Sequence, residues 1–141
     1  MNRLSELKER KKLDNNGFSL VELIIVIAIM AVLIGVLAPQ YLKYVEKSRQ
    51  SADLDSIDGI VNAVTVYSAD PANSIVDETL SCTSGSLTVG SQVAAALGDA
   101  GITNYPTMKS KAYQNWSIKF DANGLTFDGT DGGDLQKAMG Y

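Results

Sequence analysis

The longest apolar stretch of the chain runs from Phe18 to Ala38. Only Ser19 and Glu22 are polar among these 21 residues. At a rise of about 1.5 Å per residue, a helix of this length spans roughly 31 Å, close to the hydrocarbon thickness of a bilayer. A helix also satisfies its own backbone hydrogen bonds, which lipid cannot do. The pattern therefore predicts a membrane-compatible helix with one carboxylate, that of Glu22, near its start.

After Pro39 the apolar residues recur mostly at steps of three and four, which is typical of one face of an amphipathic helix. This stripe comprises Tyr41, Tyr44, Val45, Ser48, Ala52, Ile57, Ile60, Val61, Val64 and Tyr67. The charged residues between them are expected to face solvent or neighbouring subunits; they are Lys43, Glu46, Lys47, Arg49, Asp53, Asp55 and Asp58. Both stretches together predict a nearly continuous helix from about Phe18 to Tyr67. Because Pro39 lacks a backbone donor and crowds the carbonyl of Gly35, we expect a kink there.

The remaining residues, 68–141, predict a small head with mixed structure. Asp70 and Pro71 end the long helix, and the Ser-, Thr- and Gly-rich residues 75–90 predict a loop with room for one short strand. Ser91 is a candidate N-cap for a short helix that Gly98 stops. Residues 116–120 and 125–128 alternate apolar and polar positions around Asn123-Gly124, which predicts a β-hairpin. Its apolar side chains, Trp116, Ile118, Phe120, Leu125 and Phe127, are expected to pack on the stripe of the long helix.

These elements predict an α+β fold in which a long N-terminal helix packs on a small antiparallel sheet. The head is short enough for one modest core and too short for two domains. The net charge is −4, and residues 18–141 alone are more acidic, with seven basic and thirteen acidic side chains. Such a surface repels phosphates, which argues against a general nucleic-acid binder.

Candidate catalytic chemistry is scarce. The chain has no histidine, which excludes a histidine-based triad or general base. Cys82 is the only cysteine, so no intrachain disulfide can form, and we interpret it as a small, partly buried apolar side chain. No glycine-rich phosphate loop is present. The sequence thus predicts no enzyme, cofactor or catalytic residue.

One acidic segment, residues 128–134, resembles a Ca²⁺ loop. Asp128, Asp131 and Asp134 alternate with glycines, and oxygen-rich bent segments suit this ion. The spacing differs from that of an EF-hand, so we interpret the segment as a solvated acidic turn and assign no metal.

The N-terminal third resembles the prepilin-type signature of type IV pilins and pseudopilins. The matching residues are a basic leader that ends in Gly17, then Phe18, Ser19, Leu20, Val21 and Glu22, the apolar run and Pro39. The resemblance implies that a prepilin peptidase cuts between Gly17 and Phe18 and that the new N-terminus at Phe18 is N-methylated. It divides the chain into a leader (1–17), a long helix (18–67) with a membrane and filament-core part (18–38), and a head (68–141). Many members of the family close a C-terminal loop with a disulfide, which this chain cannot do.

Glu22 is the residue for which a functional role is most strongly expected. A carboxylate near a bilayer core costs about 2.5–3.5 kcal/mol or more and commonly marks function. Cleavage after Gly17 would supply a cation at similar depth, the α-amino group of Phe18, which methylation leaves charged. The resemblance implies that Glu22 pairs with the N-terminus of an adjacent subunit during assembly.

The resulting hypothesis is a type IV pilus subunit. It is held in the membrane as a single-pass protein and then polymerises into an extracellular filament. The implied partners are other copies of the chain, membrane lipid, the peptidase and N-methylase, an assembly platform with a separate ATPase, and minor pilins. Two alternatives stay open: a pseudopilin of a secretion or DNA-uptake system, and a membrane-tethered binding domain that keeps its leader.

Overall fold

The computed structural model describes residue 3 and residues 18–141. The predicted leader therefore lies outside the described residues, Gly17 included, except for Arg3. The chain divides into two compact units, residues 1–42 and 43–141. The boundary falls inside the long helix, and the second unit comprises the end of that helix together with the head.

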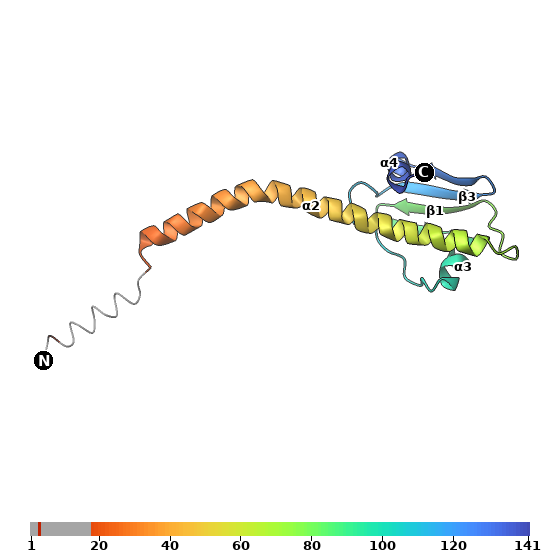
Figure 1. Ribbon diagram of the computed structural model, residues 1–141, viewed down its shortest axis with the longest axis horizontal. Helices are drawn as coiled ribbons and strands as arrows, with labels where there is room; N and C mark the ends of the chain where they lie inside the picture. Colours follow the sequence, from red (N-terminus) through yellow and green to blue (C-terminus); the bar gives the residue numbers. More distant parts are fainter. Residues whose placement is uncertain (1–2, 4–17) are drawn as a thin grey trace. The chain divides into compact units, whose positions relative to one another are not determined.

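The predicted long helix is confirmed as α2, Leu20–Ser68 (Figure 1). Pro39 lies inside the helix, which continues through it; the kink at Gly35 and Pro39 stays a prediction. The helix ends at Ser68, just before the Asp70-Pro71 pair that was expected to stop it. There the Oδ1 atom of Asp70 accepts a hydrogen bond from the backbone N–H of Ala72 at 2.9 Å, which closes the turn after the helix.

A four-stranded antiparallel sheet forms the centre of the second unit, in the order β2-β1-β3-β4. The predicted hairpin is confirmed as β3, Trp116–Asp121, and β4, Gly124–Asp128. Asp121 pairs with Gly124, so the two turn residues are Ala122 and Asn123, one position earlier than the Asn-Gly pair suggested. The α+β fold class predicted from the sequence is confirmed.

The interpretation of residues 75–90 as mostly loop was wrong. They contain a second hairpin, β1, Glu78–Thr83, and β2, Ser86–Val89. Ser84 and Gly85 form its turn, and both have positive φ, at 49° and 81°, as a type I′ hairpin turn requires. Leu80 and Cys82 are buried while their neighbours are not. The only indication of a strand in the sequence was therefore the alternation of two apolar residues, Leu80 and Cys82, with polar ones.

Two short helices accompany the sheet. Helix α3, Ser91–Asp99, was expected, but its N-cap is Gly90 instead of Ser91, and its end lies beyond Gly98. Gly101, with φ of 80°, allows Ile102 N–H to bond to the carbonyl of Leu97 at 2.8 Å, the bond that closes a Schellman motif. Helix α4, Gly132–Met139, was not predicted.

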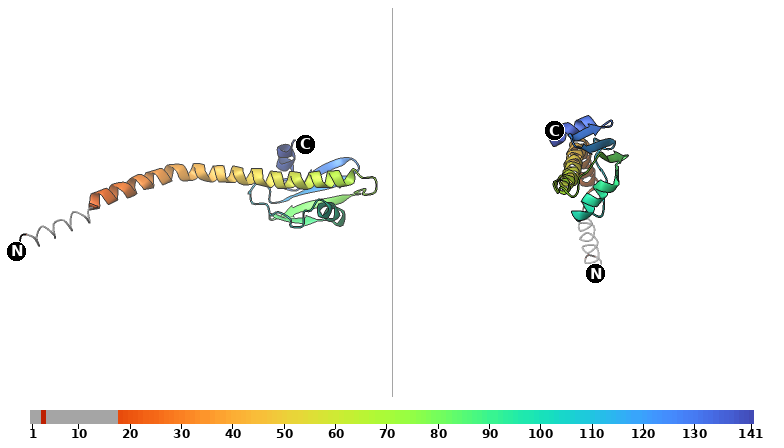
Figure 2. Two further views of the ribbon diagram at one scale, coloured as in Figure 1. Left: turned by 60° about the horizontal axis from the view of Figure 1, so that its bottom comes forward. Right: turned by 90° about the vertical axis from the view of Figure 1, so that its right-hand side faces the viewer.

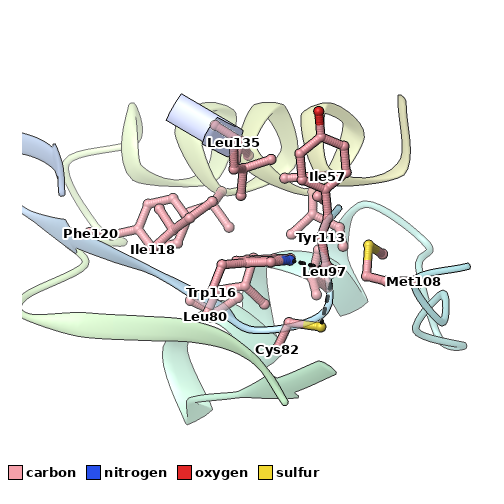
Figure 3. Close-up of a cluster of buried hydrophobic side chains, with 14 of the residues drawn as sticks. Ile57, Leu80, Cys82, Leu97, Met108, Tyr113, Trp116, Ile118, Phe120 and Leu135 are labelled. Carbon is pink, nitrogen blue, oxygen red and sulfur yellow. Dashed lines mark hydrogen bonds between the residues drawn. The ribbon is translucent and has the colours of Figure 1, made fainter. Parts of the chain in front are cut away.

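Helices α2, α3 and α4 contribute to one core on one face of the sheet (Figures 2 and 3). Alternate residues of β1 and β3, such as Leu80, Trp116 and Ile118, face Ile57 and its neighbours on α2. The complete buried set is Ile57, Ile60, Val61, Val64, Leu80, Cys82, Val93, Ala96, Leu97, Met108, Tyr113, Trp116, Ile118, Phe120 and Leu135, and Leu125 and Phe127 pack against it half-buried. The predicted packing of the hairpin on the helical stripe is confirmed.

Candidate assembly site at the start of helix α2

Ser19 and Glu22 form a reciprocal cap at the first turn of α2. The backbone N–H of Glu22 donates to Ser19 Oγ at 3.3 Å, and the backbone N–H of Ser19 donates to Glu22 Oε2 at 3.4 Å. This is a capping box, in which Ser and Glu three residues apart satisfy two backbone donors that the helix leaves unpaired. The negative side chain also lies at the positive end of the helix dipole.

The capping box gives Glu22 a structural role that was not predicted from the sequence. It also adds Ser19 to the site, although the Ser-x-x-Glu spacing was visible in the sequence. Phe18, where the implied mature chain would begin, is non-helical and 89% exposed. Glu22 therefore already bonds to the backbone one residue from that predicted N-terminus. Cleavage at Gly17, methylation of Phe18 and pairing of Glu22 between subunits stay predictions.

Among the described residues of its unit, the helix that follows this cap has no apolar partner. Every residue from Leu20 to Leu42 is exposed, and Glu22 is the only charged residue among them. An 18-residue window of α2 has a mean hydropathy of 3.1, and none of it is buried. By length and composition the segment can cross a membrane. Its apolar side chains surround the helix, so lipid or other helices must cover it on all sides.

The acidic segment near the C-terminus has a structural role in the fold. Asp131 Oδ2 accepts the backbone N–H groups of Gln114 and Asn115 at 3.0 and 2.8 Å. Asp128 and Asp134 are exposed. No group of three or more metal-ligating His, Cys, Asp or Glu residues comes together among the residues that the structure describes.

Asp53 was expected to face solvent or neighbouring subunits, and this expectation was wrong. Its side chain is 3% exposed and accepts Lys109 N–H at 3.0 and 3.1 Å and Ser110 N–H at 2.7 Å. Seven residues earlier on α2, Glu46 accepts a hydrogen bond from the backbone N–H of Lys111 at 2.8 Å. We call residues 109–115 the strap, because Glu46, Asp53 and Asp131 hold its backbone against two other elements.

The strap covers Cys82 at the edge of the core (Figure 3). Cys82 Sγ lies 3.3 Å from the carbonyl oxygen of Gln114, and Trp116 Nε1 donates to the carbonyl of Tyr113 at 3.2 Å. Burial raises the pKa of the Cys82 thiol and that of the Tyr113 hydroxyl. Cys82 is 3% exposed and packs in the core, so it is a small apolar side chain as predicted, but more deeply buried than expected.

The fold and the capped apolar helix define a pilin-like protein with a membrane-compatible N-terminal segment. Residues 12–38 match the family model described as the prokaryotic N-terminal methylation motif. The resemblance to type IV pilins and pseudopilins is thereby confirmed.

Two curated proteins are similar to the chain beyond the motif. The type IV major pilin protein PilA of Myxococcus xanthus is 28% identical over 82% of this chain and 56% of its own length. The fimbrial protein EcpC of Eikenella corrodens is 36% identical over 67% of this chain and 63% of its own length. The chain thus spans less than two thirds of either relative. No solved structure matches the chain.

Proposed function

We propose that this chain is a structural subunit of a type IV pilus that polymerises through residues 18–38 after its leader is removed. The observation that carries the proposal is the apolar helix that is exposed on every side, with Glu22 as its only charge. Lipid would cover this surface before assembly, and the same segments of other copies would cover it in the filament. The similarity to a major pilin and a fimbrial protein supports the same role.

The proposal includes the following sequence of events. A prepilin peptidase cuts after Gly17, Phe18 is methylated, and the single-pass subunit waits in the cell membrane. An assembly platform with a separate ATPase then moves it into an extracellular filament that also contains minor pilins. A short pseudopilus for secretion or DNA uptake uses the same N-terminal chemistry, and is the alternative. Mass spectrometry of the native protein should find a methylated N-terminus at Phe18; an intact leader would support the tethered domain instead.

Glu22→Ala and Glu22→Gln together test the assembly role of the carboxylate. Alanine removes both the cap and the charge, whereas glutamine removes the charge but can keep the capping-box hydrogen bond. Without the charge, the ammonium of Phe18 would enter the apolar filament core unpaired, at a cost of about 3–5 kcal/mol for each added subunit. We therefore expect both variants to be cut and inserted normally and to yield almost no filaments.

The measurement is the amount of sheared surface filament relative to membrane-held monomer. Ser19→Ala is the matched control, because it weakens the cap while leaving the charge of Glu22. Filament loss in Ser19→Ala and Glu22→Ala, but not in Glu22→Gln, would assign the effect to helix capping. Normal filaments from all three variants would remove Glu22 from the proposed mechanism.

A further inference from the structure

Basic side chains gather at the end of the second unit that follows the apolar segment. Residues 18–141 contain seven Lys and Arg residues. Five of them, Lys43, Lys47, Arg49, Lys109 and Lys111, lie on the start of this unit's part of α2 or on the strap beside it, and all five are exposed. We call these five residues the basic collar. Elsewhere the unit carries only Lys119 and Lys137, and Lys119 is paired with Asp77 at 2.6 Å.

The strap contacts bring the two parts of the collar together. Glu46 and Asp53 bind the backbone of residues 109–111, so the strap lies along the α2 line through these two carboxylates. At about 100° per residue, Lys43 and Lys47 lie roughly 70–110° to one side of that line, and Arg49 lies about 50° to the other. The strap backbone at residues 109–111 therefore lies between the basic residues that α2 places on either side.

Two of the acidic groups at this end are turned inward. Asp53 is buried, and Glu46 is half-buried against the strap. Both accept backbone hydrogen bonds, and the only ion pair within the described part of the chain is the distant Lys119–Asp77 pair. These two carboxylates therefore do not neutralise the exposed basic side chains of the collar, although Asp55 and Asp134 are exposed nearby and the protein as a whole is acidic.

We propose that the basic collar binds the phosphate headgroups of anionic phospholipids while the apolar segment is in the bilayer; this rests on the membrane residence included in the proposed function. Lys43 and Lys47 follow Ala38, the last residue of the apolar stretch, by five and nine residues along the chain. Because Lys43 comes so soon after the apolar stretch, its long side chain reaches the headgroup layer, and the strap contacts with Glu46 and Asp53 place the rest of the collar on the same part of the unit. Tyr41 and Tyr44, 68% and 67% exposed, have the amphipathic rings favoured at this interface. Juxtamembrane basic residues are attracted to anionic lipid in this way.

Energy transfer from Trp116, the only tryptophan, to a dansyl-labelled lipid headgroup tests the proposal on the full chain in vesicles. One set of vesicles contains only phosphatidylcholine, and the other also contains phosphatidylglycerol. We expect greater transfer with the anionic lipid, and loss of the increase in 1 M salt, where the Debye length falls to about 3 Å. Lys43→Gln/Lys47→Gln and Lys109→Gln/Lys111→Gln should each reduce the increase.

Lys119→Gln/Lys137→Gln is the matched control, with the same change in net charge outside the collar. This variant should keep the increase in energy transfer with anionic lipid. An equal reduction of that increase in all three double variants would show an effect of net charge and overturn a local role for the collar. Equal energy transfer in neutral and anionic vesicles would also overturn the proposal. Transfer that depends on protein density in neutral vesicles would show that the collar meets the acidic surface of a second copy instead. Resistance to carbonate extraction reports insertion separately: a chain that fails to insert contradicts both this inference and the proposed function, whereas an inserted chain without lipid dependence contradicts only this inference.

Discussion

The two parts of helix α2 have the same backbone conformation but opposite surroundings. In residues 20–42 every side chain is exposed, whereas in residues 43–68 Ile57, Ile60, Val61 and Val64 are at most 1% exposed. The difference follows from the distribution of apolar residues around the helix. Where they occur on all sides, no single sheet can cover them; where they follow one face, a sheet covers that face and water solvates the other. The distribution of apolar residues, more than the helical conformation itself, determines which surroundings each part requires.

We therefore expect the stability of the folded unit to depend on the core of the head. Trp116→Ala should have the largest effect, because the indole is 2% exposed and its Nε1 donates to the carbonyl of Tyr113. We expect a loss of about 3–5 kcal/mol in the free energy of unfolding. Denaturant unfolding followed by far-ultraviolet circular dichroism measures it.

Val32→Ala is the control for the same kind of truncation in the apolar segment, where the side chain is 67% exposed. It should leave unfolding of the head unchanged within about 0.5 kcal/mol. A loss below about 1 kcal/mol for Trp116→Ala would mean that the core does not depend on this ring.

A smaller but still large effect is expected at Asp53. Asp53→Ala leaves the N–H groups of Lys109 and Ser110 without their acceptor, at about 1–3 kcal/mol for each donor that stays buried. We expect the free energy of unfolding to fall by about 2–4 kcal/mol in total and hydrogen exchange at these two amides to become faster. Asp55→Ala is the matched control, because Asp55 is exposed on the same helix and should change stability by about 0.5 kcal/mol or less. Equal losses in the two variants would contradict a special role for Asp53.

The features that the sequence predicted well were those with a strong local pattern. The α2 helix has a sustained apolar period, and β3 and β4 alternate large apolar residues with polar ones. The β1–β2 hairpin has only Leu80 and Cys82 as fully buried alternating residues, so its Ser and Thr side chains resembled those of a loop. In α4, Gly132 and Gly133 are poor helix formers, and the helix forms because tertiary packing buries Leu135 and Gly140 closes its end in the left-handed conformation.

Side chains whose partners are distant in sequence could not be placed from the sequence. Asp53 lies among exposed charges on α2, and only the strap, more than fifty residues later, gives it backbone donors. Glu78 on β1 likewise accepts the N–H of Gln92 at 3.1 Å and so caps α3, where Ser91 was expected to act. Ser19 differs, because its partner Glu22 is three residues away and the capping-box spacing could have identified it.

The smallest change in the free energy of unfolding is expected when residues 1–42 are deleted. A fragment that begins at Lys43 retains every residue of the buried core, since the first of these is Ile57, and it keeps Glu46 and Asp53 with the strap. The deleted residues 1–42 form the other compact unit, and independent sites have nearly additive effects on stability. We therefore expect the fragment to be soluble and to unfold cooperatively, with a free energy within about 1 kcal/mol of that of the same unit in the full chain. Both proteins should be unfolded in the same mild detergent and followed by the fluorescence of Trp116, so that the full chain stays dispersed and the solvent is identical. Aggregation of the fragment, or a transition without cooperativity, would show that the apolar half of α2 stabilises the head, and the division of the helix at Leu42 would then be wrong.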